Sequence, residues 1–252
     1  MNLRQVIIFM LLSCCIDAYA QTYQNNKESN AEVAQYIEEK YIEGDDYSRM
    51  HLQELYLHLI DPTSALERNL KSQYLGFGID YLLQISSDAP GFIGMGIDYT
   101  YLENARLNTV DLIDGFPFDH STSTSMGNWT AMYRHYLGAN IVGLQPFVEG
   151  RLGLSAMWTS TSVTSNEDVD FSEFEFNNFD ASVSYSYRAG VHYAVDDALY
   201  ITGKVGYISS LSTEYDIRDS NLVGESSSYD FYSRKTSTID AIRYDLGVTF
   251  AF

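Results

Sequence analysis

Apolar and polar residues alternate one by one over several stretches of the chain, most clearly over its last fourteen positions, from Ile239 to Phe252. One face of this stretch carries Tyr244, Leu246, Val248, Phe250 and Phe252, and the other carries Arg243, Asp245, Gly247, Thr249 and Ala251. Successive side chains of a strand point to opposite faces, so the pattern predicts a strand with one apolar face and one polar or small face.

The same period of two recurs upstream. The stretches that show it are Leu52–Asp61, Gln73–Gln84, Ile93–Tyr101, Asn128–Leu137, Pro146–Trp158, Val183–Tyr193 and Leu199–Tyr207. Leu52–Asp61 is the weakest prediction, because Met50–Ile60 also fits a turn of buried helix. The second and third stretches share the pattern Gly-x-Gly-Ile-Asp-Tyr and are joined by residues with turn chemistry, which predicts a hairpin.

The connections between the predicted strands alternate in length. The short ones are Ser86–Pro90, Gly138–Leu144 and Val195–Asp197, and the long polar ones include Glu103–Gly127, Ser160–Asp180 and Glu214–Lys235. With the first strand included, eight antiparallel strands place every long connection at one end and every short connection at the other. This regularity favours an all-β, up-and-down barrel and supports the weak first strand.

The N-terminus has the features of a secretory signal peptide over residues 1–20. Arg4 is followed by an apolar segment from Val6 to Leu12, and Ala18-Tyr19-Ala20 fits a cleavage site. A lipoprotein signal with Cys14 lipidated is the alternative. Both cysteines precede the predicted cleavage site, so the mature chain is expected to form no disulfide. Residues 21–50 predict a periplasmic lead-in with a short helix, and whether this segment plugs the barrel stays open.

Composition narrows the function further. The 252 residues carry a net charge of −19, which disfavours nucleic-acid binding because that needs a basic surface. No apolar run after the predicted signal approaches the roughly 20 residues of a membrane helix. Aromatic residues make up 14% of the chain, a high share that suits the aromatic girdles of a membrane barrel.

Taken together, the signal, the alternation, the connection lengths and the aromatic C-terminus resemble those of small bacterial outer-membrane β-barrels, the class of the OmpA transmembrane domain. The resemblance covers residues 51–252 and implies an eight-stranded transmembrane β-barrel in the cell outer membrane. It also implies a monomer in contact with outer-membrane lipid and lipopolysaccharide. In that class the final aromatic strand is read by the barrel assembly machinery, a role that would fall here on Tyr244, Leu246, Val248, Phe250 and Phe252.

The predicted inward face carries many charged residues, and an eight-stranded lumen is only wide enough for side chains. We therefore expect these charges to pair in a network that fills the barrel, with Glu54 and His58 also on the inward face. The expected network consists of Asp80, Asp98, Arg134, Glu149, Arg151, Arg188, His192, Lys204, Arg243 and Asp245. A narrow, porin-like pore is an alternative.

No motif for catalysis, a cofactor or a metal was found. Some small outer-membrane barrels modify lipids, and a lipid A deacylase-like enzyme is the main alternative, for which the adjacent His120 and Ser121 are the candidate pair. The acidic segment from Glu167 to Glu175 allows weak Ca²⁺ binding. Phe171, Phe174, Phe176 and Phe179 predict either contact with a partner or packing on one another. The sequence favours a non-enzymatic barrel that acts structurally or through acidic extracellular loops.

Overall fold

The computed structural model describes residues 49–70, 72–86, 89–110, 117–138, 143–165, 172–219, 221–222 and 227–252. The predicted signal peptide and most of the predicted lead-in lie outside these residues. The barrel strands are β1 (His51–Pro62), β2 (Tyr74–Gln84), β3 (Gly91–Val110), β4 (Pro117–Tyr136), β5 (Leu144–Ser165), β6 (Ser172–Ala194), β7 (Leu199–Ser210) and β10 (Ala241–Ala251). The remaining elements are α3 (Ser64–Asn69), β8 (Ser212–Arg218), η1 (Ser228–Phe231) and β9 (Tyr232–Thr238).

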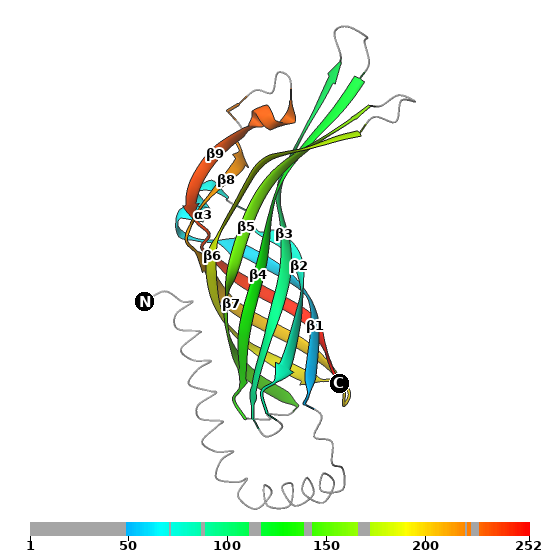
Figure 1. Ribbon diagram of the computed structural model, residues 1–252, viewed down its shortest axis with the longest axis vertical. Helices are drawn as coiled ribbons and strands as arrows, with labels where there is room; N and C mark the ends of the chain where they lie inside the picture. Colours follow the sequence, from blue (N-terminus) through cyan, green and yellow to red (C-terminus); the bar gives the residue numbers. More distant parts are fainter. Residues whose placement is uncertain are drawn as a thin grey trace, which may run out of the picture. The chain divides into compact units, whose positions relative to one another are not determined.

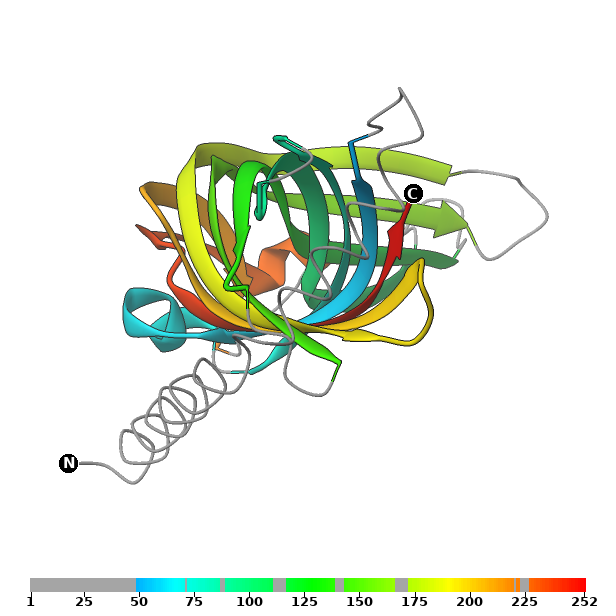
Figure 2. The same ribbon diagram turned by 90° about the horizontal axis from the view of Figure 1, so that it is seen from below.

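Eight antiparallel strands close into a barrel in the order β1-β10-β7-β6-β5-β4-β3-β2, as the predicted fold class requires (Figures 1 and 2). The weak first strand is real. It pairs with β2 from His51↔Leu83 to Ile60↔Tyr74, and it closes the barrel against β10 from Leu52↔Ala251 to Pro62↔Ala241. None of the described helices is long and apolar enough to span a membrane.

The outer wall of the barrel is apolar on every strand. Leu57 of β1, Phe77 of β2, Met95 of β3, Leu152 of β5 and Leu246 of β10 are each at least 60% exposed. The residues between them in sequence point inward and are buried, among them Glu54, Asp80 and Arg134. A water-soluble protein would place these two faces the other way round, since exposed large apolar patches are rare on monomers.

The prediction of long loops was wrong over much of its length. Residues 103–110 and 117–127 continue β3 and β4, and residues 160–165 and 172–180 continue β5 and β6. Figure 1 shows these four strands rising beyond the rest of the barrel. We call this extension the long end, and the opposite end, which carries the connections between β2 and β3, β4 and β5, and β6 and β7, the short-turn end. The third predicted loop, Glu214–Lys235, overlaps a second sheet formed by β8 and β9.

Two β-bulges explain why the extensions of β3 and β6 were missed. Tyr101 pairs with Ser125 but Glu103 pairs with Thr124, so Leu102 is an extra residue. Asn178 pairs with Thr159 but Phe176 pairs with Ser160, so Asn177 is another. An extra residue exchanges the two faces of the strand beyond it, and the alternation that marks the strand in the sequence changes phase at that point.

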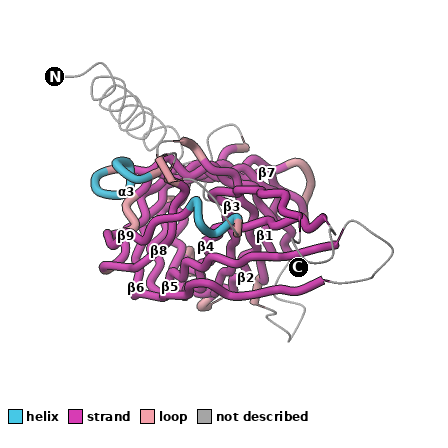
Figure 3. The backbone as a smooth tube through the Cα atoms, turned by 90° about the horizontal axis from the view of Figure 1, so that it is seen from above, coloured by secondary structure: helices cyan, strands magenta, loops and turns pink. Residues whose placement is uncertain are grey.

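The β8–β9 hairpin and η1 pack inside the long end. The hydroxyl of Thr124 donates to the backbone oxygen of Asp216 at 2.9 Å, and the hydroxyl of Tyr232 donates to the backbone oxygen of Thr122 at 2.9 Å. The backbone N–H of Arg218 donates to Glu103 at 2.7 Å. Viewed from above, the hairpin and α3 lie beside the barrel strands at this end (Figure 3). The hairpin therefore covers the inner side of the extension.

Inward and outward glycines of one strand should respond differently to substitution. A Cβ on Gly153 would lie 1.9 Å from the backbone oxygen of Trp129, whereas a Cβ on Gly150 meets nothing within 4 Å. We expect Gly153→Ala to lose the heat-dependent gel shift of the folded barrel and Gly150→Ala to keep it. Equal folding of the two variants, as measured by gel migration and circular dichroism, would contradict the register of β4 and β5.

Candidate functional site: a sealed network of charges

The interior of the barrel holds five cations and five anions. The eight barrel strands bury Arg134, Arg151, Arg188, Lys204 and Arg243 together with Glu54, Asp80, Asp98, Glu149 and Asp245. The two signs balance within this set, although the whole chain carries −19. Burial of an unpaired charge is very costly, so equal numbers of opposite charges are what a narrow, water-poor lumen requires.

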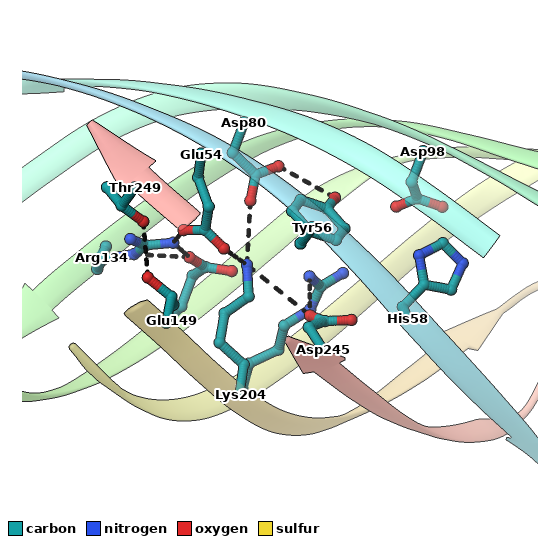
Figure 4. A network of polar contacts seen from close by, with 12 residues as sticks. Glu54, Tyr56, His58, Asp80, Asp98, Arg134, Glu149, Lys204, Asp245 and Thr249 are labelled. Carbon is teal, nitrogen blue, oxygen red and sulfur yellow. Dashed lines mark hydrogen bonds and ion pairs between the residues drawn. The ribbon is translucent and has the colours of Figure 1, made fainter. Parts of the chain in front are cut away.

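Lys204 connects the two halves of the network (Figure 4). Its Nζ lies 2.5 Å from Glu54 Oε1, 3.2 Å from Asp80 Oδ2 and 3.8 Å from Asp245 Oδ2. It also lies 4.3 Å from the centre of the Tyr56 ring, within the range of a cation–π interaction. Lys204 belongs to β7, and its acidic partners belong to β1, β2 and β10, so one ammonium group links four consecutive strands of the barrel.

Each arginine then joins further strands to this centre. Arg134 NH2 lies 2.8 Å from Glu54 Oε2 and 2.6 Å from Glu149 Oε2, and Arg151 Nε lies 2.5 Å from Glu149 Oε1. Arg151 also pairs with Asp80 through both terminal nitrogens. Arginine forks match carboxylates in this bidentate way and fix their orientation as well as their charge.

Nearer the long end, Arg243 has the corresponding role. Its NH1 donates to Asp98 at 2.8 Å and its Nε donates to Asp245 at 2.6 Å, while Arg188 NH1 donates to the other oxygen of Asp245 at 2.9 Å. Asn128 donates to the remaining oxygen of Asp98 at 2.6 Å. The ten charges thus form one connected network.

The two buried histidines extend the network. His58 lies 3.0 Å from Arg243 NH2 and 2.8 Å from the Thr100 hydroxyl. His192 lies 3.2 Å from Arg134 NH1 and 3.0 Å from the Tyr136 hydroxyl. The structure therefore brings the ten residues of the predicted network into contact, together with Glu54 and His58 of the predicted inward face, and it adds Tyr56 and Asn128.

Apolar clusters lie on both sides of the charges. At the long end, Ile60, Leu66, Leu70, Tyr74, Leu102, Met126, Met157, Ile208, Tyr215, Ile217, Ile239 and Ala241 pack together, and α3 and β8 contribute to this cluster. At the short-turn end, Leu52, Leu82, Phe92 and Met132 form a second cluster with Tyr136 and Ala251 against it. These clusters exclude water from the two ends of the network.

The candidate catalytic pair does not come together. His120 and Ser121 lie on β4, at positions that pair with Leu107 and Arg106 of β3. Neighbouring residues of a strand point to opposite faces of the sheet, so the imidazole and the hydroxyl are on different sides. Asp119 shares the face of Ser121 and not that of His120. Within the described residues, no group of three or more His, Cys, Asp or Glu side chains is arranged to hold a metal ion. Residues 167–171 of the segment predicted to allow Ca²⁺ binding lie outside the described residues.

The closed barrel, the apolar outer wall and the charged interior define the class of this protein: it is an eight-stranded β-barrel of the bacterial outer membrane. Barrels of this class have short periplasmic turns and long extracellular loops, and by that rule we expect the long end outside the cell. The exposed final strand carries Tyr244, Leu246, Val248, Phe250 and Phe252 on its lipid side.

No protein-family model matches the chain, and no curated protein matches its sequence. The crystal structure of Neisserial surface protein A has 14% sequence identity and a TM-score of 0.40, and the match covers 83% of this chain and 98% of that one. OprG from Pseudomonas aeruginosa has 14% identity and a TM-score of 0.40, covering 81% and 96% of the two chains. Ail of Yersinia pestis has 12% identity and a TM-score of 0.35, covering 81% and 99%. The class assignment rests on the barrel's own wall and interior.

Removal of the central cation should destabilise the barrel strongly. Lys204→Met leaves Glu54, Asp80 and Asp245 without one of their partners, and breaking a buried ion pair costs about 3–5 kcal/mol. We expect the urea midpoint of unfolding to be lower for this variant than for the unmodified barrel when both are measured in lipid vesicles.

The matched control is Arg234→Ala. The Arg234 guanidinium pairs with Asp216 at 3.2 Å, and the Arg234 side chain is 51% exposed. Hydrogen bonding to Asp216 raises the pKa of the Arg234 guanidinium, so this residue is charged at every relevant pH. The Asp216 carboxylate is buried, but it keeps the Tyr229 hydroxyl as a donor at 2.8 Å, and water screens the exposed guanidinium, so the midpoint should fall less than in Lys204→Met. Similar shifts of the urea midpoint in Lys204→Met and Arg234→Ala would show that the ion pairs inside the barrel do not dominate its stability.

Proposed function

We propose that this protein is a non-enzymatic anchor of the outer membrane whose extracellular sheet binds a partner. The observation that carries the proposal is the row of phenylalanines on the upper part of β6. Phe174, Phe176 and Phe179 are 59%, 64% and 62% exposed, although they lie beyond the lipid-facing wall. Exposed aromatic clusters on an otherwise polar surface are typical of interaction sites.

The bulge at Asn177 keeps the three phenylalanines on one face. Phe179 continues the outward positions of Val183 and Tyr185, and the extra residue returns Phe176 and Phe174 to that same side. The rings of Phe174 and Phe176 are 5.0 Å apart at an interplanar angle of 88°, an edge-to-face contact. Of the two alternatives that the sequence left open, packing on one another applies to Phe174 and Phe176, which stay exposed, and contact with a partner is what we propose here. Phe171 lies outside the described residues.

The same segment is a free sheet edge. β7 pairs with β6 only between Ser184 and Ala194, and the backbone N–H of Glu214 in β8 donates to the Asp180 carboxylate at 2.7 Å. Within the described residues, the edge from Ser172 to Phe179 therefore pairs with β5 on one side and with no strand on the other. An edge with unpaired backbone groups is a template for an added strand. Addition of a strand to such an edge is a common mode of peptide recognition.

The acidic charge of the long end restricts which partner strand can add to this edge. Glu173 and Glu175 lie on the face opposite Phe174 and Phe176, and acidic residues predominate among the charged residues of the described long end. The acidic ones are Glu67, Glu103, Asp119, Glu173, Glu175, Asp180, Glu214, Asp216, Asp219, Asp230 and Asp240, and the basic ones are Arg68, Arg106, Arg218, Arg234 and Lys235. The best cross-strand neighbour is an extended segment in which apolar residues alternate with Lys or Arg.

The filled interior supports an anchor in place of a pore. The ion pairs and the two apolar clusters occupy the lumen at successive levels, and an eight-stranded barrel has room for little else. We expect no steady single-channel conductance from the purified barrel in planar bilayers. Discrete, long-lived channel openings would contradict the sealed interior and favour the narrow pore.

A designed peptide tests partner binding directly. A nine-residue peptide of alternating valine and lysine should bind the detergent-folded barrel, and a valine–glutamate peptide should not, as followed by fluorescence anisotropy. The double variant Phe174→Ser/Phe176→Ser should weaken binding about tenfold or more, since two apolar contacts are lost. Arg106→Ser, on the outer face of β3 and away from this edge, should bind like the unmodified protein. Equal binding of both peptides, or no effect of the double variant, would rule the β6 edge out as the site.

A further inference from the structure

We infer that the lipid-facing wall contains a seat for one acyl chain of an outer-membrane lipid, formed around Gly150. A hollow of about 550 Å³ opens on the outer wall at this point. Its outward-facing lining is formed by Tyr133, Val148, Gly150, Tyr187, Ala189, Val205 and Tyr207. The inference does not depend on the proposed function of the extracellular sheet.

The hollow exists because a glycine lies between two tyrosines. Gly150 of β5 pairs with Tyr133 of β4 on one side and with Tyr187 of β6 on the other. A Cβ added at Gly150 would meet nothing within 4 Å. The outward glycine of β4, Gly127, differs in this respect, because a Cβ there would meet the Trp158 ring at 3.0 Å. The Trp158 side chain thus covers Gly127, whereas no side chain covers Gly150.

The width of the hollow fits a single hydrocarbon chain. Neighbouring strands are about 4.8 Å apart, so Tyr133 and Tyr187 lie on strands separated by about 9.6 Å, with Gly150 between them. A chain in van der Waals contact with a ring on each side needs about 8 Å, since carbon atoms approach each other to roughly 4 Å. The space between these two rings therefore admits one acyl chain, and beyond Tyr187 the hollow continues over Val205 and Tyr207 of β7.

Its depth also favours an acyl chain over a lipid headgroup. Gly150 is six residues from the start of β5 at Leu144. With a rise of about 3.3 Å per residue and a strand tilt of about 40°, it lies roughly 15 Å above that end, near the middle of an apolar band about 25 Å tall. The exposed side chains around it are tyrosines, valines and an alanine, and the hollow is continuous with the wall that lipid covers in any case.

A second barrel is a poorer occupant. Two barrels are convex, so their walls approach along a line, and the fixed side chains of one would have to match a slot one chain wide in the other. A flexible hydrocarbon chain follows the slot without such a match. An unfilled gap loses dispersion contacts along its whole lining. A lipid chain that fills the gap therefore gains more contacts than a second barrel would.

Native mass spectrometry of barrel extracted from outer membranes in mild detergent tests the inference. The unmodified protein should retain one lipid, whose mass identifies it as phospholipid or lipopolysaccharide. Gly150→Leu fills the slot and should lower the retained fraction about tenfold, the equivalent of roughly two buried methylene groups. Tyr187→Ala removes one wall and should also lower it.

Gly203→Leu is the matched control, because Gly203 faces outward, has nothing within 4 Å of an added Cβ and does not line the hollow. This variant should retain the lipid, and a heat-dependent gel shift establishes that every variant is folded. An unmodified barrel without lipid, or equal retention in Gly150→Leu, would overturn the inference. A dimer that Gly150→Leu separates into monomers would overturn it as well, since a second copy would then occupy the hollow.

Discussion

The pairing of charges inside a narrow barrel is the constraint on which the rest of the structure depends. A barrel spans lipid because closure leaves no unpaired strand edge within it, and eight strands leave a lumen only wide enough for side chains. Every charge on the inward face must then find a partner among the other inward side chains. Lys204 meets this condition through Glu54, Asp80 and Asp245, which come from three other strands. The network thus also fixes the register, because a slip of one residue in any of these strands would exchange its charged and lipid-facing sides.

The sequence predicted the barrel because alternation survives wherever a strand has one face in lipid and one in the lumen. It predicted the long end poorly, and the reason is local. Below Leu102 the odd positions of β3 face outward, and above it the even positions do. A count that expects one continuous period stops at the bulge, and the segment of β4 that pairs with the residues beyond it, Ser121–Thr124, consists of serine and threonine and carries no apolar face that would restore the signal. The β8–β9 hairpin was missed for a related reason, since its inward residues Tyr215 and Ile217 pack on loop and barrel residues from distant parts of the chain.

For the site, the sequence identified the inward charges but not their partners. The alternation around Asp80 and Arg151 placed both on the inward face, yet only the closed barrel brings these residues, 71 positions apart, into contact. Arg243 and Asp98 are 145 positions apart. Such pairings depend on strand order, stagger and tilt together, and the local alternation of apolar and polar residues specifies none of these. The His120–Ser121 hypothesis failed on local grounds instead, because it assumed a loop where the chain forms a strand.

Strand β6 shows how one segment serves three environments. In its lower part, Arg188 and His192 point into the charged lumen, while Tyr187 and Val191 face lipid. Above the wall the apolar residues move from odd to even positions, as Phe179 gives way to Phe176 and Phe174. Without an extra residue, those last two rings would point to the inner side, where Thr161 bonds to Thr122 and the hairpin packs, and the glutamates would point out. The bulge at Asn177, whose side chain accepts a hydrogen bond from Thr161 at 2.7 Å, restores the phenylalanines to the outer face. The change of phase in the sequence and the bulge in the structure are therefore two expressions of the same requirement: an apolar outer face that continues past the membrane.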